Sequence, residues 1–186
     1  DMKDKYTDFP VGSKWSEATY YRLGLAGELP ATVERALYVD IDTIFNRDIS
    51  PMYESEFGDC LIAGVFTTED LSEESFSRWK REMNLDRDSI YINAGVILYH
   101  IGRIREERFE SQVLSWAKNN IHRLSWQDQD ILNVCYQQRI LLLHPMWNIC
   151  DGAIWSIRWE GVTSFRNNPL KPADLLEAAR RPGIIH

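Results

Sequence analysis

The chain has 186 residues, and its hydrophobic share of 44% is enough to build one sizeable core, which excludes a disordered chain. Twenty-one Lys and Arg against 28 Asp and Glu give a formal net charge of −7, so the basic surface that is typical of nucleic-acid binding is absent in bulk. The three cysteines form no paired motif, and no apolar stretch approaches the roughly 18 residues of a membrane span. We therefore expect a soluble protein of the cytoplasm that has no nucleic-acid partner.

Helices and short apolar strands alternate along the sequence. Helices are predicted from Ser16 to residue 23, at residues 72–83 and 105–119, from residue 125 onward, and at residues 172–180. Strands are predicted at residues 36–39, 61–66, 90–99 and 140–143, and from residue 184 to the last residue. Continuous apolar runs are typical of strands that are covered on both faces. The alternation predicts a single α/β domain over residues 1–186, with a mixed, mostly parallel sheet flanked by helices.

Three Asp-x-Asp pairs occur in the sequence, and the motif alone is weak because chance supplies about one in a chain this rich in Asp. The pairs are Asp40/Asp42, Asp86/Asp88 and Asp128/Asp130. The second pair follows a polar helix, where a solvated turn is the better interpretation. Asp128 stands three residues after Ser125, so helix capping and a chemical role both remain open for it.

Asp40 and Asp42 directly follow the apolar run at residues 36–39, so both are predicted to lie at the tip of a buried strand and to point to the same side. In an α/β sheet, ligands bind at this end of the strands. Two carboxylates crowded together repel each other unless a cation lies near them. The pair therefore indicates a divalent metal site, and the alternative is two solvated loop acids.

Longer segments around these residues resemble the family 8 glycosyltransferases, which are retaining enzymes of the GT-A fold and include bacterial lipopolysaccharide galactosyl- and glucosyltransferases. The matching segments, in chain order, are residues 19–23 (TYYRL), 36–44 (ALYVDIDTI), 91–96 (YINAGV), 126–133 (WQDQDILN), 147–148 (WN) and 184–186 (IIH). Six matches in the family's order are far more specific than any one of them.

The resemblance implies an enzyme that moves galactose or glucose from a UDP-sugar to a saccharide or glycolipid acceptor such as lipopolysaccharide. It implies that Asp40, Asp42 and His186 hold Mn²⁺, with Mg²⁺ as the alternative ion, and the nitrogen ligand favours manganese. The implied donor-binding residues are Arg22, Asp40, Ile41, Asp42, Asn93, Ala94, Asp128 and Gln129. Asp128 and Gln129 are also the implied catalytic residues, and because an amide is a poor nucleophile, a front-side reaction path is expected.

The sequence departs from the family at both ends. It begins shortly before the Arg22 segment, so we expect the family's first β-α-β unit, which holds the uridine, to be missing, and it stops at His186, before the family's lysine segment. Membrane contact, expected to be peripheral at the inner face, would then use segments outside this sequence.

Two other classes stay open. One is a phosphohydrolase of the haloacid-dehalogenase type, in which Asp40 would form a phosphoaspartate, and the other is a non-catalytic relative that binds nucleotide-sugars. Aromatic residues make up 12% of the chain, and we expect some of them to belong to the core and others to contact a ligand. Trp79 and Trp116 are predicted to belong to the core, and Trp147, Trp155 and Trp159 to border the sugar site.

Overall fold

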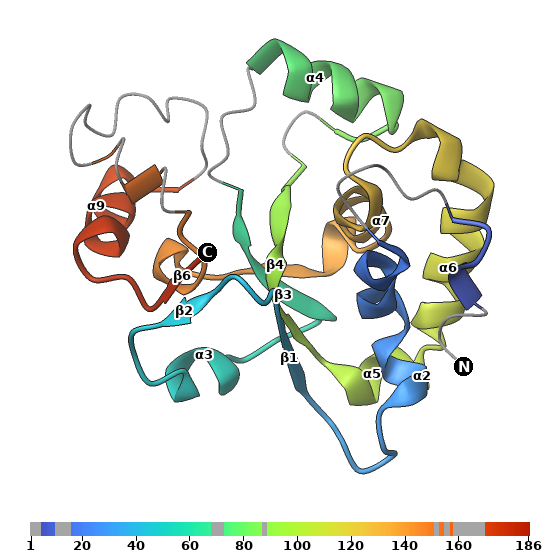
Figure 1. Cartoon of the computed structure of the whole chain (residues 1–186), viewed down its shortest axis with the longest axis horizontal. Coiled ribbons are helices and arrows are strands. Elements are labelled where there is room, and N and C mark those ends of the chain that lie inside the picture. Colours follow the sequence, from blue (N-terminus) through green and yellow to red (C-terminus); the bar gives the residue numbers. More distant parts are fainter. Residues whose placement is uncertain are drawn as a thin grey trace.

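A four-stranded mixed sheet lies at the centre of the computed structural model, which describes residues 5–9, 16–67, 73–86, 89–150, 153–154, 157 and 170–186 (Figure 1). Its strands, in spatial order, are β1 (Ala36–Val39), β4 (Ile92–Tyr99), β3 (Ile62–Phe66) and β5 (Ile140–Leu142). β4 is antiparallel to both β1 and β3, and β3 is parallel to β5. Three of the four strands therefore run in one direction and β4 alone is reversed, which confirms the predicted mixed, mostly parallel sheet.

Helices cover both faces of this sheet (Figure 1). One face carries η1 (Glu17–Gly24), α2 (Leu25–Glu28), α5 (Ile101–Glu106), α6 (Phe109–Asn120) and α7 (Gln127–Cys135). The other carries α3 (Ser50–Tyr53), η4 (Pro145–Trp147), α9 (Pro172–Arg180) and a second, two-stranded sheet of β2 (Ile44–Phe45) and β6 (Ile184–Ile185). The remaining described elements are α4 (Glu73–Glu82), η2 (Ile121–Arg123) and η3 (Gln137–Arg139).

The two cores follow from the period of the strands. In β4, which is buried along its whole length, Ile97 and Tyr99 face the η1/α6/α7 side, whereas Val96 and Leu98 face the α3/η4 side. Successive side chains of a strand point to opposite faces, so an uninterrupted apolar run fills both cores at once. This is why the run at residues 90–99 has no polar alternation.

The observed helices differ from the predicted ones in two places. The segment that starts after Ser16 is a 3₁₀ helix, η1, followed by the short α2. The helix predicted at residues 105–119 is two helices, because Arg108 takes a left-handed conformation with φ of 51° and separates α5 from α6. None of the helices in the described part of the chain has the length and hydropathy of a bilayer span.

Two pairings bring the polar residues together at one end of the main sheet. The backbone N–H of Asp40 donates to the carbonyl of Gly95 at 2.8 Å, so the β1–β4 ladder extends to the first acid of the Asp-x-Asp pair. In the second sheet Ile44 is paired with Ile185, which brings the next residue, His186, beside the loop that holds Asp42. Asp42 and His186, which are far apart in the sequence, therefore meet at the tip of β1.

Candidate active site

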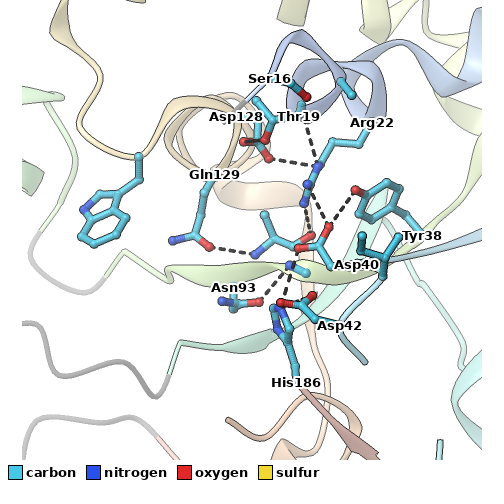
Figure 2. Close-up of a pocket in the computed structure, with 15 residues that line it drawn as sticks. Ser16, Thr19, Arg22, Tyr38, Asp40, Asp42, Asn93, Asp128, Gln129 and His186 are labelled. Atoms are coloured by element: carbon cyan, nitrogen blue, oxygen red, sulfur yellow. Dashed lines mark hydrogen bonds and ion pairs between the residues drawn. The ribbon is translucent and has the colours of Figure 1, made fainter. Parts of the chain in front are cut away.

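A cavity of about 630 Å³ opens at this end of the sheet (Figure 2). It is lined by Ser16, Ala18, Thr19, Arg22, Tyr38, Asp40, Ile41, Asp42, Asn93, Ala94, Gly95, Trp126, Asp128, Gln129 and His186. Every metal-binding, donor-binding or catalytic residue that the resemblance implied is in this set. They come from η1, the end of β1, the start of β4, the first turn of α7 and the end of β6, so the fold alone brings them together.

At one end of the cavity, Arg22 is the centre of a buried ionic network. Its Nε lies 3.0 Å from Oδ2 of Asp128, its Nη2 lies 3.0 Å from Oδ1 of Asp40, and its Nη1 donates to the carbonyl of Ala94 at 2.6 Å. The guanidinium carbon lies 4.2 Å from the centre of the Tyr38 ring. Arg22 is only 6% exposed, so these partners compensate a charge that water cannot reach.

The pKa of Asp128 reflects its buried surroundings. Burial raises its pKa to about 6, against the lowering effects of Arg22 and of the Thr19 hydroxyl, which donates to Oδ1 at 2.7 Å. Capping does not explain this residue. The backbone N–H groups of Ser125 and Trp126 donate to Oδ2 of Asp130, at 2.7 and 2.8 Å. The capping interpretation of Asp128 is therefore wrong, because Asp130 accepts those hydrogen bonds and Asp128 faces the cavity.

Gln129 is held in one orientation on the cavity wall. Its Oε1 accepts a hydrogen bond from the backbone N–H of Ala94 at 2.9 Å, and its Nε2 donates to the hydroxyl of Tyr91 at 3.1 Å. An amide fixed from both of its ends presents a neutral dipole to a ligand rather than a mobile nucleophile.

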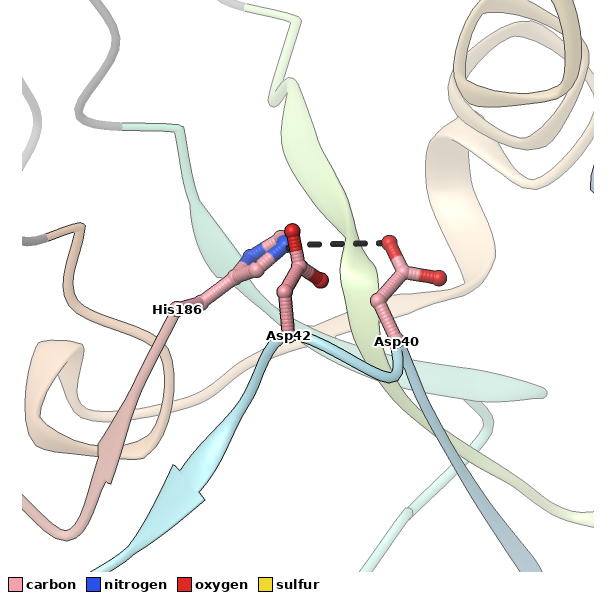
Figure 3. A group of neighbouring side chains, drawn as sticks. All are labelled: Asp40, Asp42 and His186. Carbon is pink, nitrogen blue, oxygen red and sulfur yellow. Dashed lines mark ion pairs between the residues drawn. The ribbon is translucent and has the colours of Figure 1, made fainter. Parts of the chain in front are cut away.

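At the other end of the cavity, Asp40, Asp42 and His186 face one another (Figure 3). Nε2 of His186 lies 3.7 Å from Oδ2 of Asp40 and 3.6 Å from Oδ1 of Asp42, and one ligand atom from each residue lies within 4.8 Å of the others. The Asp42 side chain is 76% exposed, so this end is open to solvent.

The residues present fit a divalent cation. Two carboxylates and one imidazole are a donor set that suits Mn²⁺ better than Mg²⁺. The backbone leaves room for it, because a Cβ added at Gly95 would lie 1.9 Å from Cε1 of His186. Glycine at this position of β4 therefore lets the imidazole lie flat against the strand and reach the acids.

Several residues of the site had no predicted role. Tyr38 donates to Oδ1 of Asp40 at 2.7 Å, and burial raises its pKa well above the usual range, so the hydroxyl stays a donor. Trp126 lines the cavity with 38% of its surface exposed. Its place two residues before the acidic pair Asp128/Asp130 is the signal that could have found it.

The tryptophan predictions had mixed outcomes. Trp79 is buried and Trp116 packs against the core, as predicted. Trp147 does not border the cavity: it is 9% exposed and packs in the α3/η4 core, with its ring against Gly183. The prediction for Trp147 is therefore wrong, because the 3₁₀ turn η4 directs its ring inward. Trp155, Trp159 and the Asp88 end of the second acidic pair lie outside the described residues.

The family described as Glycosyl transferase family 8 matches residues 1–186, and the chain belongs to this family. Its fold is the GT-A fold. The galactosyltransferase LgtC, solved in complex with donor and acceptor sugar analogs, superposes with a TM-score of 0.81 at 22% identity, over 100% of this chain and 63% of that chain. Mouse xyloside xylosyltransferase 1 superposes with a TM-score of 0.64 at 18% identity, over 100% of this chain and 69% of that one. The family match excludes the phosphohydrolase alternative.

Bacterial sugar transferases are among the curated relatives. Lipopolysaccharide 1,2-glucosyltransferase of Escherichia coli K12 is 29% identical over 147 residues, which are 78% of this chain and 42% of that protein. A putative glycosyltransferase of Haemophilus influenzae is 28% identical over 134 residues, 72% of this chain and 39% of that protein. The chain spans about two fifths of the length of these relatives.

Proposed function

We propose that this chain carries the metal- and donor-binding centre of a retaining hexosyltransferase, which transfers galactose or glucose from a UDP-sugar to a saccharide or glycolipid acceptor. The observation that carries the proposal is that the two acids after β1, the imidazole after β6 and the polar residues of β4 and α7 line one cavity. Family membership supports the reaction class, and the lipopolysaccharide glucosyl- and galactosyltransferases among the relatives support the hexose and the acceptor.

Asp40, Asp42 and His186 are the proposed ligands of the cation, and Mn²⁺ is the ion that their donor atoms favour. When bound, the cation supplies positive charge that stabilises a departing diphosphate. Ile41 stands between the two acids with its side chain fully exposed, so its contribution to donor binding is proposed to come from its backbone and its outer apolar surface.

The sugar is proposed to lie between β4 and the first turn of α7. Asn93 and Asp128 are polar residues of the cavity wall that are suited to bind its hydroxyl groups. Arg22 is proposed to hold Asp128 and Asp40 in place rather than to reach a phosphate, because it forms ion pairs with both acids while its Nε and Nη1 donate to the carbonyls of Thr19 and Ala94. This ordering prepares the cavity before the donor enters.

The environment of Gln129 and Asp128 favours a front-side reaction over a covalent glycosyl-enzyme. Gln129 is a neutral amide fixed by two hydrogen bonds, and the Asp128 carboxylate is paired with Arg22 and Thr19. In the proposed reaction the bond from the anomeric carbon to the β-phosphate oxygen breaks, and the bond to the acceptor oxygen forms on the same face. The acceptor's hydroxyl proton passes to the departing phosphate.

Calorimetry with Mn²⁺ and UDP, combined with an assay of UDP-galactose and UDP-glucose hydrolysis and transfer, tests the proposal. Asp42→Ala is expected to reduce Mn²⁺-dependent UDP binding and turnover by about 100-fold or more, because several kcal/mol of metal-derived charge stabilisation depend on its ligands. Asp59→Ala, at an exposed acid remote from the cavity, is the matched control and should match the wild type.

Full activity of Asp42→Ala contradicts the proposed metal site. Binding of UDP and Mn²⁺ with neither hydrolysis nor transfer by the wild type supports the non-catalytic alternative instead.

A further inference from the structure

Behind the cavity, the buried side chain of Asn148 joins the two halves of the proposed site. It follows η4 and is 2% exposed. Its Nδ2 donates to Oδ1 of Asn93 at 2.8 Å, and its Oδ1 lies 3.1 Å from Nδ1 of His186. One amide therefore contacts both the sugar-binding side and the metal-binding side, without lining the cavity itself.

The backbone fixes which way this amide points. The N–H of Gly95 can only donate, and it donates at 2.8 Å to the side chain of Asn93, so the atom that receives it is the oxygen of Asn93. That same oxygen faces Asn148 at 2.8 Å, so Asn148 must present its nitrogen there. The other end of the Asn148 amide, which faces His186, is therefore its oxygen.

An amide oxygen only accepts hydrogen bonds, so the contact at 3.1 Å requires a hydrogen on Nδ1 of His186. In the neutral ring the lone pair is then on Nε2, the nitrogen that faces Asp40 and Asp42. Without this contact the two carboxylates would favour the opposite tautomer, because anionic oxygens 3.6 and 3.7 Å away attract a hydrogen to Nε2. A hydrogen there would block metal binding.

We propose that Asn148 is a positioning residue that keeps the hydrogen of His186 on Nδ1 and thereby leaves Nε2 free as a ligand. The proposal rests on the proposed function in that it takes His186 to be a metal ligand. Groups behind a metal-binding histidine commonly act in this way, by fixing its tautomer and the orientation of its ring.

The same contact determines what Asn93 offers to a ligand. Its Oδ1 is occupied by the Gly95 N–H and by Asn148, and no hydrogen bond of its Nδ2 is found within the described parts of the chain. Because Asn93 lines the cavity, its Nδ2 is the donor that is left for a sugar hydroxyl. Asn148 therefore makes Asn93 a hydrogen-bond donor and His186 a lone-pair donor at once.

Two substitutions separate these effects. Asn148→Leu keeps the branched shape of the side chain, with two larger methyl groups, and removes both contacts. Asn148→Asp keeps an oxygen that accepts from Nδ1 of His186, but its second oxygen cannot donate to Oδ1 of Asn93. The primary readout needs no metal: the ¹⁵N chemical shifts of the His186 ring in the metal-free protein, measured at a pH where the spectrum itself shows a neutral ring. Titration of Mn²⁺ by electron paramagnetic resonance is the second readout.

In the wild type we expect a protonated Nδ1 and an unprotonated Nε2. Asn148→Leu should move the hydrogen to Nε2 and weaken Mn²⁺ binding by about 10- to 100-fold, the usual effect of losing such a partner. Asn148→Asp should restore the wild-type tautomer and bind Mn²⁺ at least as well as the wild type, while UDP-sugar binding stays weaker.

A wild-type ring with its hydrogen on Nε2, or an unchanged tautomer in Asn148→Leu, overturns the proposal. His186→Ala distinguishes failure of the proposed metal site from failure of the proposed role of Asn148. If His186→Ala binds Mn²⁺ like the wild type, the metal site is wrong. The effect of Asn148 on the tautomer is judged separately, from the ¹⁵N shifts of the metal-free protein.

Discussion

The two ends of the cavity handle charge in opposite ways. At the Arg22 end, a buried guanidinium is matched by Asp128, by one oxygen of Asp40 and by a backbone carbonyl. At the His186 end, Asp42 is largely exposed and two carboxylates face a single imidazole. The charges at the first end are paired within the chain, whereas the second end is the one at which we propose a cation. A cluster of acids therefore indicates a ligand site only where the chain leaves its charge unbalanced.

The largest effect on stability is expected at the Arg22 end. Arg22→Met removes the partner of a buried acid, and breaking a buried pair from one side costs about 3–5 kcal/mol. Urea denaturation should show this loss in the free energy of unfolding. Arg22→Lys keeps the charge but not the planar fork of donors, so its loss should be intermediate. If the unfolding free energy of Arg22→Met lay within about 1 kcal/mol of the wild-type value, the charges at this end would not depend on Arg22 for their pairing.

Gly95→Ala should separate metal binding from stability at the His186 end. The added Cβ would overlap Cε1 of His186, and the imidazole, at the end of its side chain, should turn away. We expect Mn²⁺ binding to weaken by about 10-fold while the protein stays folded, because disturbing the contacts that orient a metal ligand costs about 10- to 100-fold. The double variant Gly95→Ala/His186→Ala should bind no worse than His186→Ala, and additive losses would contradict this explanation.

Asp128 gives the Arg22 end a pH dependence. Its pKa is about 6 in the folded chain and close to 3.9 in an unfolded one, so the folded state binds more protons between about pH 4 and 6. Its ionisation therefore lowers the stability of the wild type as pH rises through this range, and has no further effect above it. Asp128→Asn should lack this contribution, so its unfolding free energy relative to the wild type should rise from pH 4 to 6 and then level off. If the unfolding free energies of the wild type and of Asp128→Asn changed with pH in parallel, the raised pKa of Asp128 would be contradicted.

The smallest effect on stability is expected for Asp42→Ala. Its side chain is 76% exposed and faces another acid, so its removal should change the free energy of unfolding in the absence of metal by no more than about 0.5 kcal/mol. The same variant is expected to lose metal-dependent function. A loss of stability as large as that of Arg22→Met would contradict the difference between the paired, buried charges around Arg22 and the exposed Asp42 beside His186.

The sequence predicted the parts of this fold that depend on local pattern. The apolar run before Asp40 and the longer run through Asn93 are both strands, as their patterns predicted. The longer run is buried along its whole length, but the predicted burial of the first strand is wrong, because β1 lies at the edge of the sheet and all four of its residues are only partly buried. The position of the acids at a strand tip followed directly. The break at Arg108 was not predictable, since a left-handed arginine has no composition signal.

Contacts across long sequence separations were also beyond the sequence. β2 consists of two exposed residues, Ile44 and Phe45, which become a strand only because β6 pairs with them. Asp130, rather than Asp128, caps α7 because the chain enters the helix with Trp126 and Gln127 in unusual conformations. Asn148 was only part of a matching two-residue segment, because its contacts with Asn93 and His186 join residues 55 and 38 positions away.

The pairing of β2 with β6 ties His186 to Asp42 through a sheet of only two residues on each side. On its other side β6 is held by Ile149, whose N–H donates to the carbonyl of Ile184 and whose carbonyl accepts from the N–H of His186. A segment this short still opens locally at a cost below that of global unfolding. A ligand that binds only the closed form adds about 2.7 kcal/mol to its stability at 100 times the dissociation constant. If Asp42 and His186 hold the proposed cation, pairing of β6 with β2 and binding of the cation are one equilibrium, and amide hydrogen exchange of Ile184 and Ile185 would measure the cation's affinity as a change in local folding.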